Sequence, residues 1–213
     1  MAIVALIDYG SGNLRSAEKA LARAASESGS GQQIVVTADP KIIATAERIV
    51  LPGVGAFADC MAGLKALPGM VETLHRAVFE EKIPFLGICV GMQLLATLGR
   101  EFGDHDGLNW IRGEVVKITP SDPALKIPHM GWNEPRFAKH ALFAGLPDGA
   151  HVYFVHSYKF LAADPADILA EADYGGPFAA AVGHDNIAGF QFHPEKSQAV
   201  GQIILSNFLR WQP

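Results

Sequence analysis

The sequence has little of what marks several classes of protein. Only two cysteines occur in 213 residues, Cys60 and Cys89, and neither lies in a disulfide or zinc-ligand spacing. No run approaches the ~18 uninterrupted apolar residues of a membrane span, and no lysine and arginine cluster suggests a nucleic-acid surface. The apolar run at residues 3–7 breaks at Asp8, too soon for a signal peptide. These absences predict a cytoplasmic protein that binds neither nucleic acid nor membrane.

Nothing in the sequence indicates a bound cofactor. The eight histidines, His151 and His156 among them, show no metal-ligand pattern, so we predict no metal. The segment DYGSGN (8–13) lacks the third glycine of a dinucleotide fingerprint. With 49% hydrophobic and 18% charged residues the chain can build a sizeable core, and residues 1–213 are predicted to form a single domain.

Strands alternate with helices in the first half of the sequence. Apolar runs bounded by turn residues predict strands at 3–7, 34–37, 48–51 and 84–88. Helical patterns follow them at 13–25, 41–46, 57–67, 70–81 and 91–98. Continuous apolar strands separated by helices are typical of a parallel sheet that is covered on both faces.

The second half contains more strands and less helix. Strands are predicted at 113–118, 151–161, 168–172, 178–182 and 187–192, with a hairpin turn at 183–186 and a closing helix at 199–211. The fold class that follows is α/β, with an open, mixed but mostly parallel sheet flanked by helices.

The segment GICVG (87–91) lies between a buried strand and a helix. It matches the G-x-nucleophile-x-G elbow, in which a sharp turn holds the nucleophile above the sheet. The glycines avoid collisions where the two backbones nearly touch, and the amide of Val90 is free to donate to an oxyanion. A helix N-terminus also favours the thiolate of Cys89. Taken alone, the segment leaves a buried structural cysteine in a tight strand-to-helix turn as the less favoured alternative.

The segment HPE (193–195) follows the last predicted strand. If the chain stays extended there, His193 and Glu195 point to the same side. A carboxylate so placed can orient the imidazole toward a nucleophile. His193 alone is typical of an exposed loop histidine, but the neighbouring acid and the elbow cysteine favour a catalytic pair.

The segment PGVG (52–55) follows another strand of the predicted sheet. Its two glycines permit peptide orientations that other residues resist. Ligands bind at the carboxyl ends of parallel strands, where this turn and the Cys89 turn both lie. A second oxyanion donor near Val54 is therefore expected to face the amide of Val90. An ordinary strand-to-helix turn explains this segment equally well.

These segments in this order resemble the triad-type (class I) glutamine amidotransferases, whose fold is flavodoxin-like. Within that family, DYGSGN, PHMGWNE (128–134) and YFVHSY (153–158) resemble the glutaminase subunit of imidazole glycerol phosphate synthase, from histidine biosynthesis. The resemblance covers essentially the whole chain, and PHMGWN with HPEKS is its strongest discriminator.

The resemblance implies an enzyme that hydrolyses L-glutamine to L-glutamate and ammonia through a cysteine thioester. It assigns the catalytic triad to Cys89, His193 and Glu195. It further implies contacts with glutamine from Gly55, Gln93, Glu101, Ser157 and Tyr158.

The resemblance also implies a partner. Family members dock on a (β/α)₈-barrel cyclase as a heterodimer and pass ammonia to it, and the cyclase forms imidazole glycerol phosphate and an aminoimidazole carboxamide ribotide. Four residues match positions that face this partner or the ammonia path: Asn13, Trp132, Tyr153 and Lys196.

Two rival functions remain at this point. Another member of the superfamily could serve anthranilate, pyridoxal phosphate or guanylate synthesis, although PHMGWN and Lys196 argue against it. A non-catalytic binding subunit or redox sensor could retain the elbow cysteine, but it would not need His193, Glu195 and Gln93 together.

Overall fold

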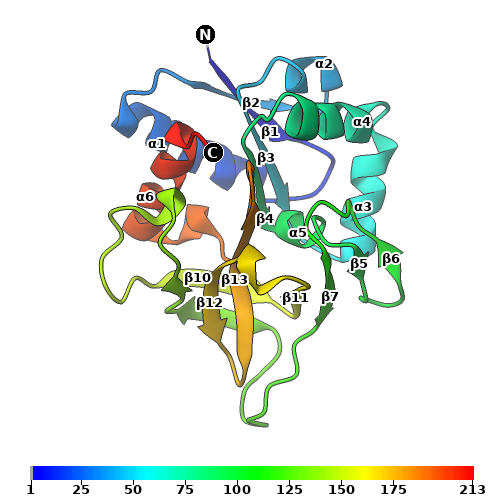
Figure 1. Ribbon diagram of the computed structural model, residues 1–213, viewed down its shortest axis with the longest axis vertical. Coiled ribbons are helices and arrows are strands. Elements are labelled where there is room, and N and C mark those ends of the chain that lie inside the picture. Colours follow the sequence, from blue (N-terminus) through cyan, green and yellow to red (C-terminus); the bar gives the residue numbers. More distant parts are fainter. Residues whose placement is uncertain (1) are drawn as a thin grey trace.

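The computed structural model describes residues 2–213, and its centre is an eight-stranded sheet (Figure 1). The strand order is β2-β1-β3-β4-β14-β13-β12-β9. Strands β2, β1, β3, β4 and β14 pair in parallel, and β13, β12 and β9 extend the sheet antiparallel. Their bounds are β1 Ile3–Ile7, β2 Gln33–Thr37, β3 Arg48–Gly53, β4 Phe85–Cys89, β9 Arg136–Phe137, β12 Ile168–Asp173, β13 Pro177–His184 and β14 Ile187–Phe190. The predicted mixed, mostly parallel sheet is confirmed.

Helices cover both faces of this sheet. On one side α1 (Leu14–Ser28) packs against α6 (Gln198–Arg210), and α3 (Phe57–Ala66) and α4 (Met70–His75) lie on the other (Figure 1). The chain continues α4 as a π-helix at Arg76–Glu80, and α2 (Pro40–Ile43) is a single short turn. Short 3₁₀ turns occur at Ala141–Phe143, Pro165–Asp167 and Pro194–Lys196. Within residues 2–213, no helix has the length and apolar character needed to cross a membrane.

The single strand predicted at 151–161 is wrong, because the structure breaks it at Ser157. Strand β10 (Val152–His156) pairs with β8 (His129–Asn133), whereas β11 (Tyr158–Ala162) pairs with β7 (Gly113–Lys117). The segment contains no glycine, proline or turn sequence at the break, so the sequence does not show that the strand changes partners there. The break matters because it brings Ser157 to the wall of a cavity.

The helix predicted at 91–98 is also wrong. Helix α5 covers only Val90–Gln93, and Leu98–Gly99 forms the short strand β5 beside β6 (His105–Asp106) and β7. The carbonyls of Leu94, Leu95 and Ala96 accept hydrogen bonds from residues 108–111. These carbonyls are therefore satisfied by a distant segment instead of by a continuing helix.

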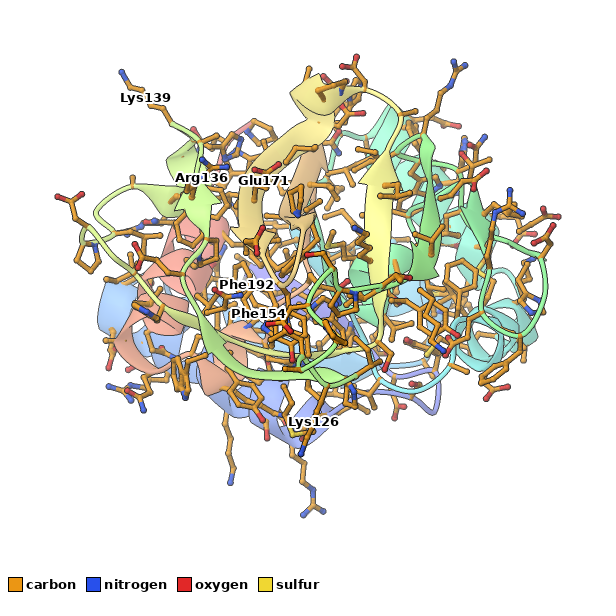
Figure 2. The ribbon with its side chains drawn as sticks, turned by 90° about the horizontal axis from the view of Figure 1, so that it is seen from below. Lys126, Arg136, Lys139, Phe154, Glu171 and Phe192 are labelled. Atoms are coloured by element: carbon orange, nitrogen blue, oxygen red, sulfur yellow. The ribbon has the colours of Figure 1, made fainter. Side chains whose placement is uncertain are left out.

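Aromatic side chains fill the space between the small sheet of β8 and β10 and the large sheet. Figure 2 shows Phe154 and Phe192 next to each other in the interior, and their ring centroids are 6.0 Å apart in an edge-to-face arrangement. Both side chains are fully buried. This packing fixes the end of β14 against β10, so the residues just after Phe192 have a defined place at the carboxyl end of the sheet.

Candidate active site

The turn after β4 holds Cys89 in a conformation that few side chains adopt. Cys89 has φ 55° and ψ −112°, so the chain reverses sharply at this residue. A Cβ on Gly91 would lie 1.9 Å from the carbonyl oxygen of Leu51, and one on Gly87 would lie 2.5 Å from that of Gly91. Strand and turn backbones thus touch at both glycine positions, which is the steric reason expected from the sequence.

The sulfur-bearing turn borders a cavity of about 300 Å³ at the carboxyl ends of the strands. A volume at the small end of ligand pockets suits a small metabolite. A larger hollow of about 560 Å³ lies at the opposite ends of β3 and β4, but no cysteine, serine, threonine or histidine occurs among the described residues that line it. The small cavity is lined by nine of the predicted site residues, namely Val54, Gly55, Cys89, Val90, Gln93, Glu101, Ser157, Tyr158 and His193.

His193 and Glu195 form a buried pair just after β14. The imidazole Nδ1 lies 2.8 Å from Glu195 Oε1, and the two side chains are 2% and 3% exposed. The chain between them is a 3₁₀ turn (Pro194–Lys196), so the extended exit expected from the sequence is wrong. The tight turn, and not an extended strand, brings the two side chains into contact. Because Nδ1 faces the carboxylate, Nε2 is the ring nitrogen left for chemistry, and it is buried without a hydrogen-bond partner among residues 2–213.

The surroundings of His193 favour its charged form. Burial disfavours the imidazolium, but the neighbouring Cys89 and Glu195 outweigh burial and raise the pKa of His193 to about 9. By contrast, burial raises the pKa of the Cys60 thiol, which keeps that cysteine neutral. The site can therefore supply a proton from an imidazolium next to a sulfur nucleophile.

Two side chains present hydrogen-bond acceptors to the cavity. The amide nitrogen of Gln93 donates to the carbonyl of Tyr158 at 3.2 Å and to Gln191 Oε1 at 2.9 Å. Both of its hydrogens are then used, and the carbonyl oxygen of Gln93 remains. One oxygen of Glu101 accepts from the Phe57 amide at 2.7 Å, which leaves the other. An amide oxygen and a carboxylate oxygen together suit an ammonium group.

The two predicted oxyanion donors are in different states. Val90 opens α5, so its N–H has no acceptor within the helix. The N–H of Val54 instead donates to the Ser11 hydroxyl at 3.3 Å, and that hydroxyl donates to the Val54 carbonyl at 2.6 Å. The Cys60 thiol also lies 3.4 Å from the same carbonyl. Ser11 and Cys60 therefore hold the Val54 peptide, and its N–H is occupied.

Three of the four residues expected to face a partner lie together. Trp132 is 47% exposed and meets Tyr153 edge to face, with ring centroids 6.0 Å apart. The ammonium of Lys196 lies 5.5 Å from the Tyr153 ring centroid, within cation–π range. Asn13 is exposed at the start of α1, and its side chain makes no capping hydrogen bond to the described residues of that helix.

Sequence reasoning missed two elements of this site. Gln191 lies two residues before His193, with its side chain fully buried beside Cys89. His129 and His156 form a buried pair with their ring nitrogens 2.9 Å apart, and His156 Nδ1 lies 2.8 Å from the Tyr158 carbonyl. The strand pattern at 187–192 could have pointed to Gln191, because a polar residue there interrupts an apolar run.

The histidine pair predicts a specific pH dependence of stability. Burial lowers the pKa of His129 to about 4 and that of His156 to about 3, from an ordinary value of 6.5. At pH values between the lowered pKa of each folded histidine and its ordinary value of 6.5, the unfolded chain binds more protons than the folded one. The free energy of unfolding therefore falls as pH drops below 6.5. The slope is about 1.4 kcal/mol per pH unit for each histidine.

Urea unfolding between pH 7.5 and 4.5 measures this slope. The double variant His129→Gln, His156→Gln is expected to be less stable at pH 7.5 but to lose stability less steeply on acidification. Equal slopes for the parent and the double variant would contradict the assignment of two neutral buried histidines.

A family model and curated relatives match nearly the whole chain. A family model described as "Glutamine amidotransferase class-I" matches residues 5–211. Imidazole glycerol phosphate synthase subunit HisH of Rhodospirillum rubrum is 60% identical over 212 residues, with 99% of both chains covered. The protein of the same description from Caulobacter vibrioides is 59% identical over 214 residues, with 100% of both covered.

Solved structures with much lower identity share the fold. A structure described as a glutamine amidotransferase has a TM-score of 0.70 at 16% identity, covering 95% of this chain and 98% of the other. A glutamine amidotransferase from Thermotoga maritima has a TM-score of 0.60 at 17% identity, covering 91% of this chain and 76% of the other. At such identities the likeness concerns the fold alone.

Proposed function

Because this chain belongs to the class-I glutamine amidotransferase family, we propose that it hydrolyses L-glutamine to L-glutamate and ammonia with Cys89 as the nucleophile. The observation that carries the proposal is the shared cavity, where the elbow cysteine meets a histidine paired with a buried carboxylate. The full-length similarity to imidazole glycerol phosphate synthase subunits supports a place in histidine biosynthesis.

In the first half of the reaction the Cys89 thiolate attacks the side-chain amide carbon of glutamine. The carbonyl oxygen becomes an oxyanion, which the N–H of Val90 stabilises. His193 Nε2 then donates a proton to the amide nitrogen, and the carbon–nitrogen bond breaks to release ammonia. A γ-glutamyl thioester on Cys89 remains.

In the second half water completes the reaction. His193, now neutral, removes a proton from water, and the resulting hydroxide attacks the thioester carbon. The carbon–sulfur bond breaks, the new carboxyl group loses its proton to solvent as glutamate leaves, and the thiolate and imidazolium are restored. Glu195 Oε1 holds Nδ1 throughout and stabilises each imidazolium that forms.

The cavity walls orient glutamine for this attack. The free oxygens of Gln93 and Glu101 accept from its α-ammonium group. Gly55, Ser157 and Tyr158 line the same cavity, and their backbone amides would receive its α-carboxylate. The side chain of glutamine then extends toward Cys89.

The ammonia passes to a (β/α)₈-barrel cyclase, which forms imidazole glycerol phosphate and an aminoimidazole carboxamide ribotide. Its docking surface on this chain includes Asn13 and the cluster formed by the exposed Trp132 and Lys196 with the half-buried Tyr153. Ammonia released into bulk water would be protonated and would no longer be a nucleophile. A direct path to the partner keeps it in the reactive, unprotonated form.

The isolated chain is expected to be a poor glutaminase that its partner activates. The Val54 N–H is occupied by Ser11, so one oxyanion donor is missing until that peptide turns. Loss of one such donor typically costs about 10²–10³ in rate. We expect glutamate release to rise at least roughly a hundredfold when the cyclase and its nucleotide ligand are added.

Glutamate release by the purified chain, alone and in the complex, tests this expectation. The cyclase alone serves as the control for contaminating glutaminase. Full activity of the isolated chain, indifferent to the cyclase, would contradict both the occupied donor and the assignment to this subfamily.

A further inference from the structure

A buried glutamine outside the triad touches the nucleophile. Gln191 follows β14, and its side chain is fully shielded from solvent. Its amide nitrogen lies 3.8 Å from Cys89 Sγ, within hydrogen-bond range for sulfur. Its amide oxygen lies 2.9 Å from the amide nitrogen of Gln93. The side chain therefore bridges the reacting sulfur and a wall of the substrate cavity.

The direction of this bridge follows from its neighbours. The Tyr158 carbonyl can only accept, so the group of Gln93 that faces it at 3.2 Å must be the NH₂. That same NH₂ faces Gln191, so Gln191 must turn its oxygen toward Gln93. Its own NH₂ is then left for the sulfur, and Gln191 is a hydrogen-bond donor to Cys89.

The Tyr158 carbonyl is itself held from the other side. His156 Nδ1 lies 2.8 Å from it and donates an N–H, so His156 Nε2 must accept from His129 Nδ1. Burial lowers the pKa of both histidines, which keeps this pair neutral and its tautomers fixed. A chain of one-way hydrogen bonds thus anchors the orientation of Gln93 and Gln191.

The sulfur of Cys89 needs such a donor. It is only 4% exposed, and α5 has a single turn, so the dipole of the longer helix predicted at 91–98 is absent. A buried anion without a donor is costly, and hydrogen bonds to ionised acceptors are stronger than those between neutral groups. Gln191 supplies an N–H where the thiolate forms.

We propose that Gln191 is a further residue of the reaction centre, whose side-chain N–H stabilises the Cys89 thiolate and aims it at the substrate carbonyl. Gln93 holds the amide of Gln191 in the donating orientation. This inference rests on the proposed function of Cys89 as nucleophile, and it extends the site beyond the Cys–His–Glu arrangement.

Two substitutions separate donation to sulfur from simple packing. Gln191→Met keeps a similar volume without an N–H, and Gln191→Glu keeps an acceptor for Gln93 but puts an acid beside the sulfur. Alkylation of Cys89 by iodoacetamide, followed from pH 5 to 10 at the level of its peptide, reports the thiol–thiolate equilibrium. The Cys60 peptide is resolved in the same digest.

We expect the midpoint of the Cys89 profile to rise by about one pH unit in Gln191→Met, a tenfold change in the equilibrium. A larger rise is expected in Gln191→Glu, where a carboxylate faces the thiolate. In the complex with the cyclase, glutaminase kcat should fall roughly tenfold in Gln191→Met while KM stays within about twofold.

Gln202→Met is the matched control, because Gln202 lies on α6 and, within the described part of the chain, its side chain bonds only the Ala20 carbonyl, at 3.4 Å. It is expected to retain the parental alkylation profile and kcat. Parental midpoints in both Gln191 variants would overturn the proposal. A higher KM with an unchanged midpoint would also overturn it, since Gln191 would then act on substrate binding through Gln93.

Thermal unfolding identifies the folded variants, and either Gln191 variant suffices for the test. Alkylation requires no glutamine, so the failure modes are distinguishable. A parent complex that releases no glutamate would refute the proposed function, whereas unshifted midpoints would refute only the role of Gln191.

Discussion

Replacing Cys89 with alanine is expected to abolish glutamine-dependent product formation by the complex while ammonium salts still support it. The elbow turn places this sulfur against the cavity beside His193, and no other cysteine or serine hydroxyl at that wall has a paired histidine among residues 2–213. The substitution removes the thioester route without altering the cyclase. Product formation with glutamine and with ammonium chloride, measured side by side, gives the comparison.

A γ-glutamyl affinity label provides a control within the same molecule. It should modify Cys89 and spare Cys60, because Cys60 is 1% exposed and burial raises the pKa of its thiol. Equal labelling of both cysteines would mean that simple thiol accessibility decides the reaction. A Cys89→Ala variant that hydrolyses glutamine within tenfold of the parent would show that Cys89 is not the nucleophile.

The parts of the fold that could be predicted from the sequence are those that depend on local patterns of residues. Strands β1, β3 and β4 are apolar runs that end in glycine turns, and a strand buried on both faces produces that pattern. The turn glycines were also predictable, because their role is steric and is fixed by the neighbouring backbones. These features depend on residues within a few positions of one another.

The features that could not be predicted depend on distant partners. The strand breaks at Ser157 because the residues before it pair with β8 and those after it pair with β7. Helix α5 ends early because the carbonyls that follow it accept hydrogen bonds from residues 108–111. The occupied N–H of Val54 needs Ser11, which is 43 positions away in the chain. Local sequence patterns contain no information on such pairings, because these form only when distant segments pack together.

The His193–Glu195 pair shows both cases at once. The sequence predicted that the two side chains lie together, and they are in contact, but the geometric reason was wrong. The expected extended strand is a 3₁₀ turn, and the 2.8 Å contact arises because Pro194 starts that turn. The two residues are so close in sequence that they meet even though the predicted local conformation was wrong.

His193→Ala is expected to lower glutaminase turnover in the complex by several powers of ten, because Nε2 both donates the proton to ammonia and activates water. Glu195→Gln is expected to cost less. It preserves size and can still hydrogen-bond Nδ1, but it removes the charge that helps raise the pKa of His193 to about 9. With that pKa lowered, less imidazolium is available at neutral pH, and the loss should grow as pH rises from 6 to 9.

The pH dependence separates catalysis from packing. Glutaminase turnover of the parent and Glu195→Gln complexes, measured from pH 6 to 9 at saturating glutamine, should converge toward low pH and diverge toward high pH. Ammonium-dependent product formation should be the same in both, since the cyclase is untouched. Equal turnover at every pH would reduce Glu195 to a structural residue, and Cys89 and His193 would then act as a dyad.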